Sequence, residues 1–216
     1  MAAYPDTLPL SSLGSVSNRV QSDDPNLRAM IRHRNTSFAR FGAGRVVDSS
    51  TDPAGTADGL FAYSPLATTD FSANANYYPL RVDAEYAGRT VAIDGNGKLY
   101  DGSYLLTVDW NPAGTTANST LTAVISSLAG FTSGGVGVSQ IGFSHTFSGS
   151  AFNETPAPRV RYSTGSDKSL TDGVHAGQFV GNNGPDGHYG VFGRWGLTEG
   201  TDLIEGGFGA DLVRAP

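Results

Sequence analysis

The sequence contains no cysteine, which excludes disulfide bonds, thiolate metal sites and a cysteine nucleophile. It also offers no cysteine to carry a lipid. Charged residues make up only 16% of the chain, and the net charge is -6. This balance disfavours a dedicated nucleic-acid-binding protein, because phosphate binding needs a strong local cationic field. No run of 18 apolar residues occurs, so the sequence predicts no membrane-spanning helix.

Lysine and glutamate are rare, with 2 and 4 residues, whereas glycine fills 29 of 216 positions. Lysine and glutamate are good helix formers and glycine is a poor one, so the composition argues against a helical bundle. Threonine, aromatic and spaced apolar residues are frequent, which is typical of strands and argues against a wholly disordered chain. We therefore expect a mainly β protein.

The N-terminal part of the sequence carries its best helix pattern. Residues 1–22 are rich in proline and serine, and we expect them to be flexible. An amphipathic helix is predicted over residues 25–41, because Asp24 can cap it and Pro25 suits its first position. This helix would present a basic patch for an anionic partner, formed by Arg28, Arg32 and Arg40.

The rest of the sequence predicts a loop followed by strands. Residues 48–77 are expected to form a loop around a short apolar piece, Leu60 to Tyr63. Later segments are short, alternate between apolar and polar residues, and are separated by turn residues, which is typical of a sandwich or barrel. The predicted strands lie near residues 78–82, 85–93, 104–110, 119–128, 138–147, 148–153, 158–163, 174–181, 189–197 and 203–213. We expect the last strand to pair with the one near residues 191–197, and a bulge at Gly206-Gly207 to bring Leu203 to the inward face. Glycines within the strands are expected where aromatic rings lie over them.

One turn resembles a calcium loop at first sight. Asp94-Gly95-Asn96-Gly97 has residue types that adopt positive φ in hairpin turns. A calcium loop would need an acidic residue at the twelfth position, and Leu105 stands there instead. The sequence therefore predicts a hairpin turn here and no metal site.

The C-terminal stretch HAGQFVGNNGPDGHYGVFGRWGLTEGTDLIEGGFGADLV carries a resemblance. It is similar to the barrel ending of the transferrin-binding-protein-like β-barrel family, which includes transferrin-binding protein B, the factor H binding protein and hemophilin. The matching positions are Gly177 and Phe179, Gly184-Pro185, Gly190-Val191-Phe192 and Gly207-Phe208-Gly209-Ala210. The resemblance covers about residues 138–214.

This resemblance implies a fold and a place in the cell. The fold would be a C-terminal antiparallel β-barrel of about eight strands in residues 131–216. A strand-rich, handle-like region with one amphipathic helix would precede it in residues 23–130. One continuous domain is the alternative. The resemblance implies an exported bacterial protein, extracellular or at the cell surface, whose leader is absent from this chain.

The function implied by the resemblance is binding rather than catalysis. The sequence contains no Gly-x-Ser-x-Gly elbow, no phosphate-binding loop and no recognisable acid/base pair of carboxylates, so no enzyme is expected. The partner would be a host protein or a small hydrophobic ligand such as haem. The alternative function is a structural subunit of a surface layer, filament or other assembly, in which self-association would use exposed strands.

The candidate binding residues are histidines and aromatic residues. Haem capture would need neutral imidazoles, whereas tyrosine and tryptophan are frequent anchors of protein interfaces. The candidates are His33, His175, His188, Tyr189 and Trp195. No pair of histidines shows metal-ligand spacing.

Overall fold

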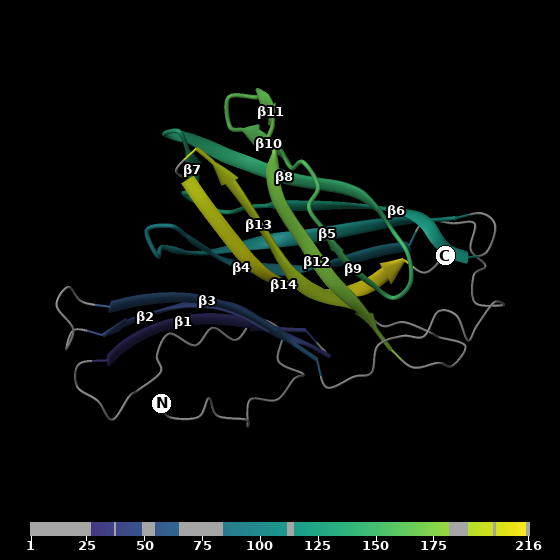
Figure 1. The fold of residues 1–216 in the computed structure, drawn as a ribbon, viewed down its shortest axis with the longest axis horizontal. Helices are drawn as coiled ribbons and strands as arrows, with labels where there is room; N and C mark the ends of the chain where they lie inside the picture. The colour runs from purple at the N-terminus through teal and green to yellow at the C-terminus, as the bar shows by residue number, and fades with distance from the viewer. Residues whose placement is uncertain are drawn as a thin grey trace.

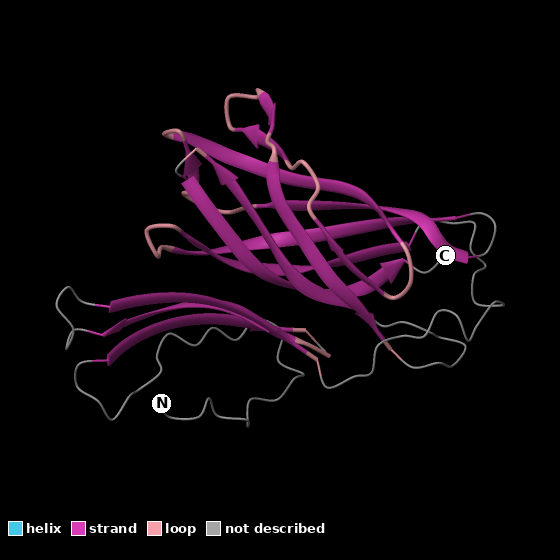
Figure 2. Ribbon diagram, in the orientation of Figure 1, coloured by secondary structure: helices cyan, strands magenta, loops and turns pink. Residues whose placement is uncertain are grey.

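The computed structural model describes residues 27–36, 38–48, 55–64, 84–111, 115–181, 190–200 and 202–214. These residues contain strands, turns and loops but no helix (Figure 2). A long apolar helix that could cross a membrane is likewise absent from the part of the chain that the structure describes. The mainly β composition expected from the sequence is confirmed.

The first three strands form a small antiparallel sheet in the order β1-β2-β3. The strands are β1 (Leu27–Asn35), β2 (Arg40–Asp48) and β3 (Gly55–Tyr63). The helix predicted over residues 25–41 is therefore wrong, and the predicted loop over residues 48–77 contains a strand. Pairing with β2 along all nine residues of β1 gives the backbone its hydrogen bonds in a sheet, which overrides the local helix pattern.

The remaining strands form a large antiparallel sheet. Their order is β11-β10-β8-β6-β5-β4-β14-β13-β12-β9, and β7 pairs with β8 beside this path. The strands are β4 (Ala84–Asp94), β5 (Leu99–Asn111), β6 (Thr115–Ser126), β7 (Thr132–Ser133), β8 (Val136–Phe147), β9 (Ala151–Glu154), β10 (Arg159–Tyr162), β11 (Asp167–Ser169), β12 (Asp172–Val180), β13 (Gly190–Glu199) and β14 (Asp202–Arg214).

The large sheet is strongly curled but its hydrogen-bonded ladder does not close into a barrel (Figure 1). Within the described residues, β9 pairs only with β12, and residues 143–147 of β8 pair only with β6. The two strands lie next to each other in the chain and leave a seam between them. The closed barrel implied by the resemblance is thus corrected to an open, curled sheet.

The last strand lies near the middle of the sheet. β14 pairs with β13, as the sequence predicted, and with β4 on its other side. A bulge expected at Gly206-Gly207 is absent, because the register against both neighbours is continuous there. Ile204 occupies the inward face instead of Leu203, so the alternation needs no inserted residue.

The large sheet also crosses the boundary proposed at residues 130/131. β4, β5 and β6 precede that boundary and share one sheet with the strands that follow it. How the chain divides into independently folding domains stays a prediction.

Aromatic side chains fill the concave interior of the large sheet. Tyr104 and Phe208 stack with ring centroids 4.0 Å apart, and the buried Trp195 donates a hydrogen bond from Nε1 to Oγ1 of Thr90, 2.8 Å away. Trp195 also lies over Gly206, where an added methyl group would come within 2.7 Å of the ring. Rings lying over glycine, which the sequence predicted, explain part of the high glycine content.

The small sheet packs on the outer face of the large sheet, as a second layer below it in Figure 1. Phe41 and Ala43 from β2 pack with Val91 and Ile93 from β4 in a second buried cluster. Phe41 also lies against Gly209 of β14, where a side chain would collide with its ring. β14 is therefore covered on both faces, which requires small residues on its outer side.

An ionic clamp adds to this packing between the sheets. Asp101, on the outer face of β5, accepts a hydrogen bond from Nε of Arg34 at 2.9 Å and lies 3.2 Å from Nη1 of Arg32. The side chains are between 17% and 30% exposed, so they are partly shielded from water. Arg32 and Arg34 are two residues apart on β1 and therefore reach the same side of the strand.

The clamp predicts a measurable loss of stability. We expect Asp101→Asn to lower the free energy of unfolding by about 1–2 kcal/mol, because two half-buried guanidinium groups lose their counter-charge. Urea unfolding followed by circular dichroism measures this change. Asp109→Asn is the matched control, since Asp109 is exposed on the same strand and makes no ion pair among the described residues. Equal losses in the two variants would contradict the clamp.

Candidate binding groove

A groove runs along the outer face of the large sheet, beside β3. It consists of two cavities of about 590 and 330 Å³ that share Leu60 and Arg194 in their linings. β3 is the last strand of the small sheet, and among the described residues its outer edge pairs with no strand. The groove is thus bounded by an open strand edge on one side and by β12 and β13 on the other.

The floor of the groove consists mostly of small or apolar residues that point away from the aromatic core. Val174 and Ala176 contribute from β12, and Phe192 and Gly196 contribute from β13. Except for Phe192, these side chains are short or absent. A concave surface that combines apolar residues with polar groups is the usual form of a binding site.

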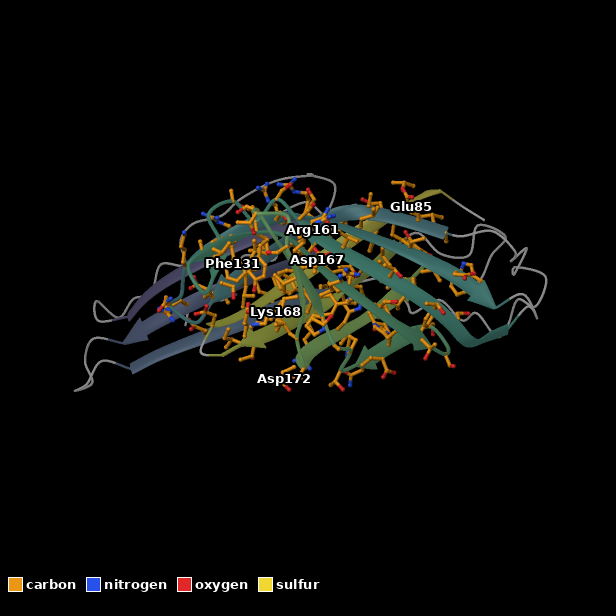
Figure 3. All side chains as sticks on the ribbon, turned by 90° about the horizontal axis from the view of Figure 1, so that it is seen from above. Glu85, Phe131, Arg161, Asp167, Lys168 and Asp172 are labelled. Carbon is orange, nitrogen blue, oxygen red and sulfur yellow. The ribbon has the colours of Figure 1, made fainter. Side chains whose placement is uncertain are left out.

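The groove also contains charged residues. Arg194 is exposed where the two cavities meet, and it forms no ion pair with any residue that the structure describes. Glu205 and Asp172 line the larger cavity, and Asp172 is labelled in Figure 3. A partner with an acidic group could therefore pair with Arg194 without displacing an existing partner within the described chain.

A chain of hydrogen bonds lies inside the sheet, next to the groove. Nε2 of His145 is 2.9 Å from Nδ1 of His175, and Nε2 of His175 is 2.8 Å from the hydroxyl of Tyr104. Phe152 of β9 packs against both imidazoles, with ring centroids 5.7 and 4.8 Å away, and it also lines the smaller cavity. The hydrogen-bond chain and the groove thus share a neighbouring residue, Phe152.

Burial shifts the titration of these groups. Desolvation lowers the pKa of His175 well below its usual value, and the neighbouring His145 lowers it further. Desolvation also lowers the pKa of His145, although Thr146 and Glu154 act in the opposite direction. Burial raises the pKa of Tyr104 well above its usual value. All three groups are therefore neutral at pH 7.

The candidate histidines from the sequence do not come together. His33 is buried in β1, and desolvation, Arg40 and Arg34 lower its pKa. His175 lies in the core of the other sheet. His188 lies outside the described residues.

The two candidate aromatic anchors have separate outcomes. Tyr189 lies outside the described residues. Trp195 is 1% exposed, so its indole packs in the core instead of at a surface. Trp195 nevertheless belongs to the residues that line the larger cavity.

The basic patch expected on a helix is dispersed in the small sheet. Arg32 faces the large sheet and pairs with Asp101. Arg40 belongs to the opposite side, because Phe41, the next residue, packs toward the large sheet. The side chain of Arg28 lies outside what the structure describes.

The turn at residues 94–97 is confirmed. Oδ1 of Asp94 accepts hydrogen bonds from the backbone N–H groups of Asn96 and Lys98, both at 2.9 Å. Its Oδ2 accepts a hydrogen bond from the hydroxyl of Tyr100 at 2.7 Å. The carboxylate is thus used within the hairpin. No cluster of three potential metal ligands occurs among the residues that the structure describes.

Sequence reasoning missed the partners of His175 and the groove. His145 alternates with Phe143 and Phe147, which are both buried, so strand parity could have placed it inside the sheet. Tyr104 begins the strand predicted over residues 104–110, which has the same alternation. The groove had no comparable pattern, because it forms between strands that are more than 100 residues apart in the chain.

Comparisons with known proteins support the fold. No family model and no curated protein sequence matches the chain. Among solved structures, transferrin-binding protein B from serogroup B Neisseria meningitidis matches over 93% of this chain at a TM-score of 0.51 and 13% identity. A double mutant of the protein from Haemophilus parasuis matches over 89% at a TM-score of 0.53 and 13% identity. The chain spans 36% of each of those chains, so the likeness concerns one part of a longer protein.

Proposed function

We propose that this chain is a bacterial surface or secreted binding protein that holds a protein partner in the groove beside β3. The observation that carries the proposal is the groove itself, which combines an open strand edge, a floor of small residues and the exposed Arg194. The structural likeness to transferrin-binding protein B, which is a binding protein by name, supports the same class of function. A location at the cell surface belongs to this proposal.

The geometry favours a protein over haem as the partner. Both ring nitrogens of His175 already have hydrogen-bond partners in the core, so haem ligation would require one of these hydrogen bonds to break. His33 belongs to a different sheet, so the two imidazoles do not face a common cavity. A groove beside a strand edge instead suits an extended segment of a protein, which can add main-chain hydrogen bonds to β3.

Charge reversal at the centre of the groove tests the proposal. Purified transferrin is the first probe, because it is the partner in the name of the similar structures. We expect Arg194→Glu to weaken binding by about tenfold or more, because an acidic group of the partner would lose its counter-charge and meet a like charge. Surface plasmon resonance measures the dissociation constant.

The matched control is Arg89→Glu. Arg89 is exposed on β4 and does not line the groove. Retained binding in this control and loss in Arg194→Glu would support the groove as the site. If both variants bind transferrin as the wild type does, the groove is not its site. If the wild type does not bind, transferrin is eliminated, and a panel of serum proteins is tested with the same pair of variants.

Self-assembly is the second candidate function, and the open edge of β3 favours it. An unpaired strand edge can accept a strand from another copy of the same chain. Size-exclusion chromatography with light scattering separates the two functions. A monomer whose mass does not change with concentration supports capture of a foreign partner, whereas growing assemblies support a structural subunit.

A further inference from the structure

The seam of the large sheet contains the hydrogen-bonded pair of histidines. His145 is half-buried in the stretch of β8 that pairs only with β6, and β9 faces this stretch across the seam without pairing to it. Along its other edge, β9 pairs with β12, and Glu154 of β9 lies opposite His175 of β12. His145 on β8 and His175 on β12 therefore connect β8 to the strand that carries β9, at the place where β8 and β9 share no backbone hydrogen bonds.

The direction of the hydrogen bonds in this chain follows from its last acceptor. Nδ1 of His145 lies 3.2 Å from the carbonyl oxygen of Thr146, which can only accept, so this nitrogen carries the proton. Nε2 of the neutral His145 must then accept from Nδ1 of His175. Nε2 of His175 in turn accepts from the hydroxyl of Tyr104. Every member is satisfied only when both imidazoles are neutral and protonated on Nδ1.

Protonation disrupts this arrangement. A proton added to Nε2 of His145 would face the N–H on Nδ1 of His175, so His175 would have to move its own proton to Nε2. Tyr104 would then accept from His175, and its hydroxyl hydrogen would lose its acceptor in a core where the residue is 1% exposed. A buried donor without an acceptor is unfavourable, so the protonated state favours separation of the two histidines.

The remaining groups around the pair do not remove this conflict. Besides Tyr104 of β5, the charged group that acts on the pair is Glu154 of β9, which favours protonation of His145. β6 faces it with Leu121, and β14 faces it with Phe208. β13 contributes Trp195, which lies opposite His175 in the ladder. No described group among these can accept the displaced hydrogen.

We infer that Tyr104, His175 and His145 form a one-way hydrogen-bond chain that links β8 to β12 across the seam when neutral, and that mild acid breaks this link and loosens β9, whose Phe152 packs on both imidazoles. The binding groove would thus be sensitive to pH through the packing of Phe152 on both imidazoles. Burial lowers the pKa values of both histidines in the folded protein. The state with the intact hydrogen-bond chain is therefore fully present above about pH 6.5 and is lost as the pH falls below that value.

Nuclear magnetic resonance of the wild-type protein tests the direction of the chain. Long-range ¹H–¹⁵N correlation spectra at pH 7.5 should show both His145 and His175 protonated on Nδ1. Protonation of either ring on Nε2 at this pH would overturn the proposal, whatever the stability of any variant.

Hydrogen exchange tests the release of β9. Between pH 7.5 and 5.5, we expect the amides of residues 151–154 to exchange about tenfold faster after correction for the intrinsic rate, while those of β5 do not change. His145→Gln should abolish this change, because its side-chain oxygen accepts from His175 at every pH. His33→Gln is the matched control and should retain it. An unchanged acid response in His145→Gln, or a wild-type β9 that stays protected, would refute the proposal.

A second variant distinguishes the effect of the hydrogen-bond chain on the pKa of His145 from the effect of burial alone. Tyr104→Phe leaves Nε2 of His175 without a hydrogen-bond donor in the neutral state, so the neutral chain loses part of its advantage and the pKa of His145 should rise toward its ordinary value. Burial alone predicts the opposite, since the substitution makes the core less polar. A lower pKa of His145 in this variant, measured by the same spectra, would contradict the one-way chain.

Discussion

Phe208→Ala is expected to lower the free energy of unfolding by about 3–5 kcal/mol. The Phe208 side chain is fully buried in the central strand β14 and stacks on Tyr104 with its ring planes only 9° apart. It also contacts His175, with ring centroids 5.7 Å apart. Its removal would leave a cavity in the middle of the aromatic core, which the rigid neighbouring strands cannot fill.

Leu203→Ala is the matched control for this experiment. Leu203 lies on the same strand, but its side chain points outward and is 39% exposed. We expect this variant to lower the free energy of unfolding by about 1 kcal/mol or less, because much of the apolar surface that it removes is already in contact with water. Chemical unfolding of both variants measures the difference. Similar losses would mean that β14 does not have the inward and outward faces described above.

Gly88→Ala is expected to destabilise the protein by about 2–3 kcal/mol, although it adds only one methyl group. Gly88 on β4 lies opposite Ala210 of β14. A Cβ atom at this position would collide with the carbonyl oxygen of Gly209 and lie 2.6 Å from the Cα of Ala210. Because these obstacles are backbone atoms, the added methyl group must push the two strands apart.

Gly142→Ala adds the same methyl group at a position with space for it. On β8, the nearest atoms to an added Cβ would be the carbonyl oxygens of Arg159 and Ala123, at 3.7 and 3.9 Å. The substitution also reduces the freedom of the unfolded chain to the same extent as at Gly88. We expect a change within about 1 kcal/mol, in the stabilising direction. Thermal unfolding of both variants measures the difference. Equal losses of stability would contradict the explanation.

These predictions depend on glycines that have a spatial role. The sequence showed that glycine is abundant in segments that otherwise alternate like strands, and it predicted that aromatic rings would lie over some of them. Gly206 under Trp195 and Gly209 under Phe41 confirm this. Gly88 has a different role, since a backbone lies against it, and the sequence contained no indication of that neighbour.

Strands were predictable where one face of a strand contacts the core. The segments near residues 85–93, 104–110, 174–181 and 189–197 all alternate with a period of two, and each is a strand in the structure. Alternation is a local property, because successive side chains of a strand point to opposite faces. The sequence could therefore determine these strands without knowledge of their neighbours.

The N-terminal region shows the limit of this reasoning. Residues 25–41 have apolar residues at helical spacing and good capping residues, yet residues 27–35 pair with β2. The contacts that stabilise this strand come from outside it, including Asp101, which is 67 residues away from Arg34. A local pattern cannot represent such a contact, and tertiary pairing overrides local propensity when it satisfies the backbone equally well.

The sequence by itself determined a mainly β chain without disulfides, the position of several of its later strands and the likeness of its C-terminal stretch to a family of β-barrels. Only the tertiary structure decided that the large sheet stays open at a seam, that β14 joins β13 to β4, and that His175 meets His145 and Tyr104. It also created the groove between β3 and β13. The physical reason is the range of the interactions: alternation acts between adjacent residues, whereas sheet order, buried hydrogen bonds and grooves depend on segments that only folding brings together.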